Sequence, residues 1–256
     1  MGEKDSDSGR VGGVDGVSGG WVMAVTGVKP GSPVEAMAVW RSFGELWSSA
    51  RQIGLLAVTV DIPIGLPCRG SRSCDQEARL RLKGCPGPPK HPGRASSVFP
   101  APPRCALEAR EWEEALALAR GCTGKGITKQ SFALFPKIRE VRDALDPSDF
   151  RSSDRPRAAE VHPEVSFQEM AGCPMWFHKS RQAGVAERLE QLEAHFPNVV
   201  DATVRTKRVG PPHPGVDDLL DAVAAAWTAR RLISEDAKPL GGHQTDQTGF
   251  EMSIWV

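Results

Sequence analysis

The sequence predicts one α/β domain with a mixed central sheet, antiparallel in its opening strands and parallel afterwards, with helices on both faces. Three observations support this fold class. Two β-rich runs, residues 11–17 and 20–28, flank a Gly/Ser turn and indicate a hairpin. A nearly continuous apolar run at 55–65 is typical of a central strand that is paired in parallel and buried on both faces. Helical periodicities then alternate with further apolar runs, as in α/β folds.

The remaining early elements follow in chain order. A third strand is expected near residues 34–40. Residues 43–53 come next and carry Leu46, Ala50 and Ile53 at helical spacing. A helix therefore separates the opening strands from the central strand of 55–65.

Later elements are predicted from the same two periodicities. Helices are expected where apolar residues recur at helical spacing, around 74–83 and at 107–120, 129–145, 186–196 and 217–233. Pro136 interrupts the helix of 129–145, because proline lacks the amide hydrogen that a helix interior needs. Strands are expected at 158–167 and, closing the chain, at 249–256.

The domain organisation is simple. Residues 1–10 are polar and indicate a disordered tail, so the domain is expected to span 11–256. Within it, residues 63–104 are dense in Pro, Gly, Arg and Cys and predict a long excursion rather than a domain boundary. Long loops of this kind are usually functional.

Composition excludes a chain that is disordered throughout. The 256 residues are 40% hydrophobic and 25% charged, values typical of a soluble globular protein. The 32 Lys and Arg residues equal the 32 Asp and Glu residues in number, so the formal net charge is +0. The bulk charge therefore identifies no partner.

The six cysteines are even in number, but the chain is too long to be read as a short secreted disulfide scaffold. We therefore expect reduced thiols. Cys68, Cys74 and Cys85 share one segment but form no CxxC pair, which disfavours a zinc site. No stretch approaches the roughly 18 apolar residues that a membrane span needs, and no signal-peptide pattern is present. We expect a cytoplasmic protein with no membrane partner, and the sequence leaves its oligomeric state open.

Acidic side chains recur where buried elements end. They are Asp15 after the first strand, Asp61 after the central strand, Glu160 and Glu164 near the end of the 158–167 run, and Asp217, Asp218 and Asp221 at the start of the last helix. A carboxylate at such a place is costly unless it is hydrogen-bonded, paired or bound to a cation. Oxygen ligands with few His or Cys residues favour Mg²⁺ or Mn²⁺ over zinc.

The acids of the last helix have two interpretations. Asp218 and Asp221 are three residues apart and Asp217 and Asp221 four apart, so either pair can share one helix face. That spacing permits two metal ligands from one helix. Alternatively, these acids cap the helix and interact with its dipole, which is the more common role of Asp at a helix start.

Seven sequence blocks, in order, resemble those of domain-of-unknown-function family 429, which is described as predicted nucleases with a ribonuclease H-like fold. The blocks are GVDGVSGGWVMAV (13–25), TVDIPIGLP (59–67), RSCDQEAR (72–79), ASSVFPAPPR (95–104), PKIREV (136–141), EVHPEVSF (160–167) and DDLLDAVAAAWTARR (217–231). The resemblance runs from about residue 11 to the closing IWV. Seven blocks in order are far more specific than any single one.

The resemblance implies a ribonuclease H-like fold and a site with two metal ions. In such enzymes an Asp on the first strand, an acid at the end of the fourth and acids on a late helix hold the metals. Asp15 and Asp61 match the first two places. Asp218 and Asp221 resemble the acidic helix of the superfamily's Holliday-junction resolvases. The implied activity is Mg²⁺- or Mn²⁺-dependent hydrolysis of phosphodiester bonds, with nucleic acid as the substrate.

Glu164 and His162 belong to a block that is special to this family. Glu164 is a candidate metal ligand. His162 is a candidate general acid or base, although a single His in an apolar run is more often a structural hydrogen-bonding residue. Both roles are therefore expectations of the resemblance.

Substrate contacts are expected from two basic segments. Residues 69–94 contain seven basic and two acidic residues, a local excess that attracts phosphate. The alternative is a solvated loop and helix face. We expect the contacts from Arg72, Arg79 and Arg94 and, in a second and weaker segment, from Lys137 and Arg139.

Two other functional classes remain open. The opening hairpin also resembles the first phosphate-binding hairpin of actin-like kinases and ATPases, which predicts ATP binding. Those proteins normally duplicate the core, and this chain has length for one copy. The third possibility is a non-catalytic binding module that keeps the fold while its acids serve as helix caps.

Overall fold

The computed structural model of the chain describes residues 9–87, 89–151, 156–207 and 212–256. Most of the predicted tail, residues 1–8, lies outside these ranges. Arg10, also assigned to the tail, is instead the first residue of a strand. Among the described residues, no helix has the length and apolarity needed to cross a membrane.

The described residues form a seven-stranded sheet in the order β3-β2-β1-β4-β5-β7-β6. The strands are β1 (Arg10–Val17), β2 (Gly20–Gly27), β3 (Val34–Trp40), β4 (Ala57–Val60), β5 (Arg157–Val161), β6 (Pro239–Leu240) and β7 (Ile254–Trp255). The first three strands pair antiparallel, β1, β4, β5 and β7 pair in parallel, and β6 closes the edge antiparallel to β7. This mixed arrangement confirms the predicted ribonuclease H-like fold class.

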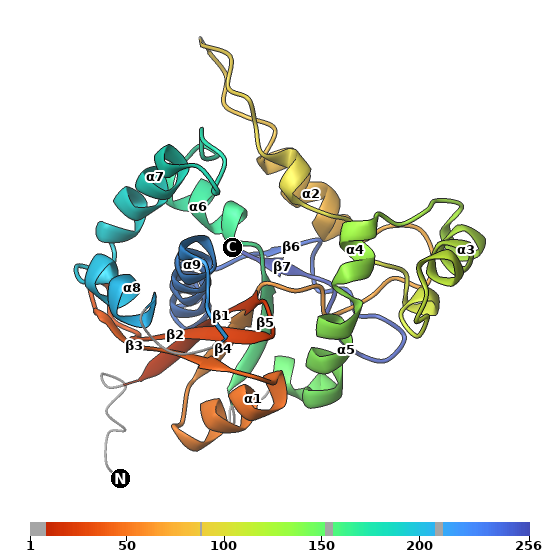
Figure 1. Cartoon of the computed structure of the whole chain (residues 1–256), viewed down its shortest axis with the longest axis horizontal. Helices are drawn as coiled ribbons and strands as arrows, with labels where there is room; N and C mark the ends of the chain where they lie inside the picture. Colours follow the sequence, from red (N-terminus) through yellow and green to blue (C-terminus); the bar gives the residue numbers. More distant parts are fainter. Residues whose placement is uncertain (1–8, 88, 152–155, 208–211) are drawn as a thin grey trace.

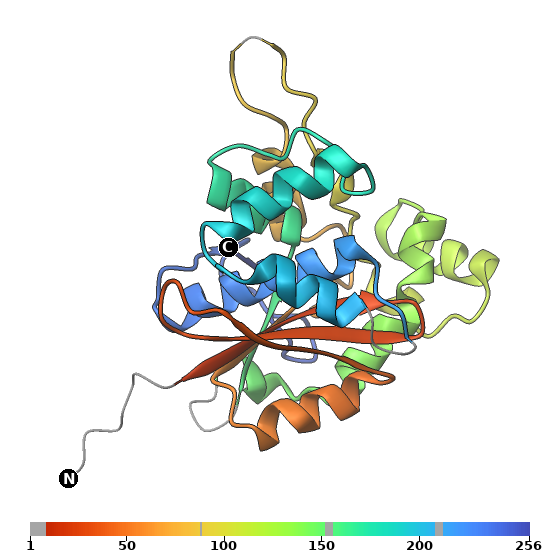
Figure 2. The ribbon, with the colours of Figure 1, turned by 60° about the vertical axis from the view of Figure 1, so that its left-hand side comes forward.

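Helices cover both faces of the sheet (Figures 1 and 2). The α-helices are α1 (Phe43–Gln52), α2 (Ser73–Arg81), α3 (Trp112–Thr123), α4 (Lys129–Ala133), α5 (Phe135–Ala144), α6 (Pro163–Ala171), α7 (Gln182–Glu193), α8 (Val199–Lys207) and α9 (Val216–Ile233). Short 3-10 turns are η1 (Ala95–Ser97), η2 (Arg104–Ala106) and η3 (Pro147–Phe150). Helices α1 and α5 pack on one face, and α6 to α9 on the other.

Helix α9 makes the closest approach to the sheet. A Cβ atom at Gly13 of β1 would lie 1.9 Å from the backbone nitrogen of Ala226. Thr59 of β4 donates a hydrogen bond to the carbonyl oxygen of Ala225 at 2.7 Å. Glycine on the strand and alanine on the helix therefore bring the two backbones together, and this contact places the acidic start of α9 beside the end of β1.

Two predicted strands are shorter than their apolar runs. The run of 55–65 forms β4 only over Ala57–Val60, and the prolines that follow in DIPIGLP cannot donate ladder hydrogen bonds. The run of 158–167 splits into β5 and α6. Pro163 lies in the first turn of α6, where a missing amide hydrogen costs nothing. Glu164 is therefore a helical residue rather than a strand-end residue.

Other elements deviate less. Helix α3 begins at Trp112 rather than at residue 107, and the predicted terminal strand of 249–256 shortens to β7. The 129–145 segment divides at Leu134 into α4 and α5, which agrees with the expected interruption at Pro136. Helix α8 was not predicted. Trp21, like most of the described apolar residues of β1 and β2, is fully buried.

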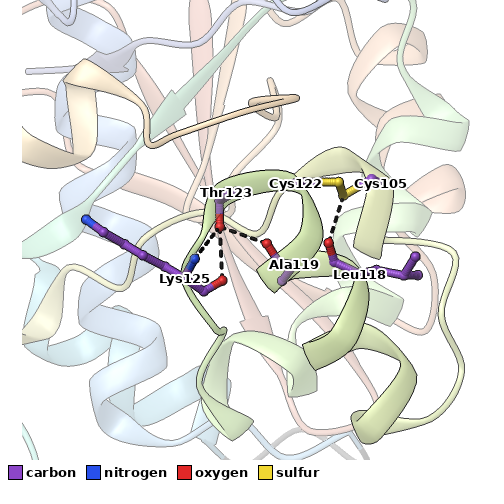
Figure 3. The surroundings of a disulfide bond; sticks show 6 residues. All are labelled: Cys105, Leu118, Ala119, Cys122, Thr123 and Lys125. Carbon is purple, nitrogen blue, oxygen red and sulfur yellow. Dashed lines mark hydrogen bonds between the residues drawn. A yellow bond between two sulfur atoms is a disulfide. The ribbon is translucent and has the colours of Figure 1, made fainter.

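Four of the six cysteines form disulfide bonds, so the prediction of reduced thiols was wrong for them. The pairs are Cys85 with Cys173 and Cys105 with Cys122, whereas Cys68 and Cys74 are free. The second pair ties η2 to the end of α3 (Figure 3). Sequence spacing did not reveal these pairs, because the folded chain brings together residues that are distant in the sequence.

The close contact of α9 with β1 predicts opposite effects for two Gly→Ala substitutions. Gly13→Ala should lower the free energy of unfolding by about 3 kcal/mol or more, because the new methyl group overlaps helix backbone. The matched control is Gly44→Ala in α1, where an added Cβ meets no atom within 4 Å. It should raise stability by about 0.5 kcal/mol. Urea unfolding measures both, and equal stabilities for the two variants would contradict the packing described.

Candidate functional site

A cavity of about 680 Å³ lies at the carboxyl ends of β1, β4 and β5. Parallel strands end at the same edge of a sheet, so residues that are distant in sequence meet there. The acids in the cavity wall are Asp15, Asp61, Asp75, Glu160, Glu164 and Asp221. Five of these six were singled out in the sequence; Asp75 was not.

Asp15, Asp61 and Asp221 come from three elements. Asp15 lies on β1, is 7% exposed, and its Oδ1 accepts the backbone N–H of Gly16 at 2.7 Å. Asp61 directly follows β4, and its own backbone N–H donates to Val14 of β1 at 3.0 Å. Asp221 lies in the second turn of α9 and is 2% exposed. The strand pairing and the α9 contact therefore position all three.

Glu164 and His162 come from the junction of β5 and α6. Glu164 is buried, and its Oε1 accepts a hydrogen bond from Arg188 of α7, which is itself fully buried. Its Oε2 is buried with no hydrogen-bond partner among the described residues. His162 is the N-cap residue of α6. Its Nε2 lies 3.3 Å from the carbonyl oxygen of Ser97, and its buried Nδ1 has no partner in the described part of the chain.

Lys179 is a site residue that the sequence did not reveal. It lies in the loop between α6 and α7, and its Nζ donates to Oδ2 of Asp221 at 2.6 Å. The neighbouring His178 also lines the cavity. A single lysine in a loop carries no periodicity or motif, so only the fold shows where its ammonium group lies.

The carboxyl groups raise one another's pKa. Burial raises the pKa of Asp15 well above its usual range, and the charges of Asp61 and Asp221 raise it further. Burial also raises the pKa of Asp61, with a further contribution from Glu164. The pKa of Asp221 rises to about 7, through burial and then repulsion by Asp61, although Lys179 opposes the shift. Burial is the largest cause of each shift, and repulsion between neighbouring carboxylates adds to it.

The donor chemistry of this cluster fits a hard divalent cation. Its ligating atoms are carboxylate oxygens, which Mg²⁺ and Mn²⁺ prefer. Asp221 Oδ1 and Glu164 Oε2 are buried carboxylate oxygens without a partner in the described ranges. Among those residues, no three His, Cys, Asp or Glu side chains stand close enough to hold a metal ion as they are placed. Asp15, Asp61, Glu164 and Asp221 are the residues that would hold the ion, and their carboxylates would have to move closer together to do so.

Asp218 and Glu160 have structural partners instead. Asp218 does not line the cavity, and its Oδ2 accepts the N–H of Gly215 at 2.7 Å, which caps α9. Glu160 does line the cavity, but both of its oxygens bind Arg72, at 2.6 and 2.7 Å, and Oε2 also accepts the N–H of Ile64. The capping interpretation of the acidic helix therefore describes Asp218, while Asp221 faces the cavity.

Three of the five predicted basic contacts line the cavity. Arg72 is buried against Glu160 and Asp75, Arg94 donates to the carbonyl of Met175 at 3.0 Å, and Lys137 donates to that of Gly20 at 2.5 Å. The other two, Arg79 and Arg139, are absent from the wall. They donate to the carbonyls of Val98 and Leu107 respectively. Arg72, Arg79 and Arg94, which supply much of the positive excess of residues 69–94, therefore bind groups of the protein itself.

A family model described as "Protein of unknown function (DUF429)" matches residues 13–246. No curated protein and no solved structure matches the chain. The matched range includes every acidic residue that lines the cavity.

The raised pKa of Asp15 predicts a pH-dependent gain in stability when its charge is removed. In metal-free buffer at pH 8, Asp15→Asn should unfold with a free energy higher by on the order of 1 kcal/mol. The folded carboxyl has a higher pKa than in the unfolded chain. The wild type therefore loses more stability than the variant as the pH rises above about 4, because the variant keeps the raised pKa values of Asp61 and Asp221 but lacks that of Asp15. Near pH 4 the wild type and Asp15→Asn should have the same free energy of unfolding.

Urea unfolding with a chelator at several pH values measures this difference. Asp217→Asn is the matched control, because Asp217 opens the same helix but does not line the cavity. Asp217→Asn should change the free energy of unfolding by less than about 0.5 kcal/mol at both pH 4 and pH 8. A wild type that is more stable than Asp15→Asn at pH 8 would contradict the electrostatic account.

Proposed function

We propose that this chain, which belongs to the DUF429 family of proteins of unknown function, is a metal-dependent nuclease that hydrolyses phosphodiester bonds of nucleic acid. The observation that carries the proposal is the convergence of Asp15, Asp61, Glu164 and Asp221 on one cavity at the strand ends of a ribonuclease H-like sheet. The chemistry that bound Mg²⁺ or Mn²⁺ supplies at such a site is a water nucleophile of lowered pKa and stabilisation of charge developing on the phosphate.

The chain's own residues prepare the site for this reaction. Arg188 binds Oε1 of Glu164 and leaves Oε2 unpartnered, while the N–H of Gly16 fixes the carboxylate of Asp15. His162 lies close enough to Asp61 to lower the pKa of that carboxyl group. The unpartnered Nδ1 of His162 is the atom suited to hold or release a proton.

The cavity wall also offers positive charge to a phosphate. Lys137 packs its ammonium group 4.1 Å from the ring centroid of Trp21 and lines the cavity, as does Arg94. Burial lowers the pKa of Lys137. Both groups are fixed by hydrogen bonds to backbone carbonyls, so they are placed before a substrate arrives.

The stability cost of the cluster favours catalysis over a purely structural role. Burial raises the pKa of the structural acids Glu160 and Asp218 as well, so the direction of the shift does not by itself identify a functional acid. Asp15 differs in that two other acids of the cavity wall, Asp61 and Asp221, repel its charge in addition to the effect of burial. Mutually repelling buried acids are typical of functional sites. The ATP-binding alternative is less favoured, since the described part of the chain holds one copy of the core.

Removing either strand-end carboxylate should abolish catalysis. Asp15→Asn and Asp61→Asn are each expected to reduce Mn²⁺- or Mg²⁺-dependent cleavage of a mixed panel of DNA and RNA substrates at least about 100-fold, more than loss of a residue that merely supports a ligand. The rate of product formation on denaturing gels measures the effect, and a chelator should stop the wild-type reaction.

Asp217→Asn is the control, because it removes an acid from the start of α9 without altering the cavity wall. It should cleave at the wild-type rate. Undiminished cleavage by the Asp15 or Asp61 variant would exclude the assigned site, and tight ATP binding without any cleavage would favour the actin-like alternative.

A further inference from the structure

We propose that the cavity wall beside α4 binds an unpaired base, which makes single-stranded nucleic acid the substrate class of this chain. The proposal rests on the nuclease function proposed above and names its substrate. The residues that make this base subsite are Phe99, Gln130, Leu134 and Lys137, all of which line the cavity. None of them is acidic, so the subsite does not depend on how the carboxylates hold a metal ion.

Phe99 presents an aromatic ring at the cavity and is 38% exposed. Phe99 and Phe177 are the exposed phenylalanines in the described part of the chain, and of these two only Phe99 lines the cavity. The face of an aromatic ring stacks on a nucleobase whatever the identity of that base. Phe99 therefore offers a platform for one base.

The backbone on both sides of Phe99 is fixed by hydrogen bonds. The carbonyl of the residue before it accepts from Arg79 at 3.0 Å, and the carbonyl of the residue after it accepts from Ser131 of α4 at 3.1 Å. The N–H of Ala101 donates to the carboxylate of Asp75 at 3.0 Å. Because a fixed backbone lowers the cost of ordering a binding site, the ring is placed for stacking before a ligand arrives.

The helical segment beside Phe99 adds an amide, an apolar and a basic group. Gln130, Leu134 and Lys137 follow one another at spacings of four and three residues, which places them on one helical face. The hydrogen bond from Ser131 holds this segment against the Phe99 loop. Leu134 extends the apolar surface on which a base lies. Gln130 is exposed, and its amide can both donate to and accept from the edge of that base.

Two contacts connect the base subsite to the acidic end of the cavity. Lys137 packs over the residue that follows Asp15, where an added Cβ would lie 3.0 Å from the lysine stem. Ser97, two residues before Phe99, has its carbonyl oxygen 3.3 Å from Nε2 of His162 at the end of β5. A phosphate attached to a base on Phe99 therefore meets the ammonium group of Lys137 beside Asp15.

This arrangement selects unpaired over paired bases. In a duplex each base is stacked between its neighbours, so an aromatic ring reaches only a base that has left the stack. Taking a base out of the stack costs least in a strand that is already single. The cavity volume of about 680 Å³ is also typical of sites that take one small organic group. A duplex would contact the basic residues through its phosphates but leave Phe99 unused.

The test is the affinity of the full chain for fluorescein-labelled oligonucleotides, measured by fluorescence anisotropy with a chelator present so that nothing is cleaved. The wild type should bind single-stranded DNA or RNA at least about 5-fold more tightly than a duplex of the same sequence. Phe99→Ala should weaken single-strand binding at least about 5-fold and leave duplex binding unchanged, because it removes only the stacking ring. Phe99→Trp, which keeps an aromatic face, should bind as the wild type does.

Phe177→Ala is the matched control, because it removes an exposed phenylalanine that does not line the cavity. It should change neither affinity. If Phe99→Ala fails to fold, Phe99→Leu keeps an apolar side chain without an aromatic face and should show the same loss of single-strand binding.

The outcomes separate this proposal from the proposed function. Equal single-strand affinity of the wild type and Phe99→Ala, tighter binding of the duplex, or no binding of any oligonucleotide would overturn the base subsite. Displacement of the single strand by micromolar ATP would also overturn it, in favour of a free nucleotide. The nuclease function is decided separately, by the cleavage rates of the Asp15 and Asp61 variants.

Discussion

Mutual repulsion among carboxylates that share one cavity is the constraint on which the rest of the site depends. Asp15, Asp61 and Asp221 are brought together by the sheet and by α9, and their pKa values are raised first by burial and then by neighbouring carboxylates of the cavity wall. A cluster of this kind lowers the stability of the fold unless cations balance its negative charge. Proteins keep such destabilising clusters where they are needed for function. Arg188 and Lys179 supply part of that compensation, and the unpartnered oxygens show where it is incomplete.

Close packing elsewhere in the fold offsets the destabilising effect of the carboxylate cluster. Gly13 allows α9 to lie against β1, and Thr59 bonds to the helix backbone within this contact. The same close packing that stabilises the sheet also determines the separation of Asp15 and Asp221. Stability and site geometry therefore depend on the same glycine and alanine positions.

The sequence predicted the strand-end acids well, because strands and one long apolar helix leave clear periodic signals. Asp15, Asp61 and Asp221 could be placed at the ends of buried elements before the fold was known. Glu164 was placed on a strand, since an apolar run before Pro163 does not show where β5 stops. Lys179 and the disulfide pairs were missed because only three-dimensional packing brings those residues to their partners.

The most direct test of the central claim, that these carboxylates form a metal site, is a crystal structure of the wild type grown with Mn²⁺ and measured for anomalous scattering. We predict an anomalous peak in the cavity lined by Asp15, Asp61, Glu164 and Asp221. A cavity without an anomalous peak at saturating Mn²⁺ would contradict it.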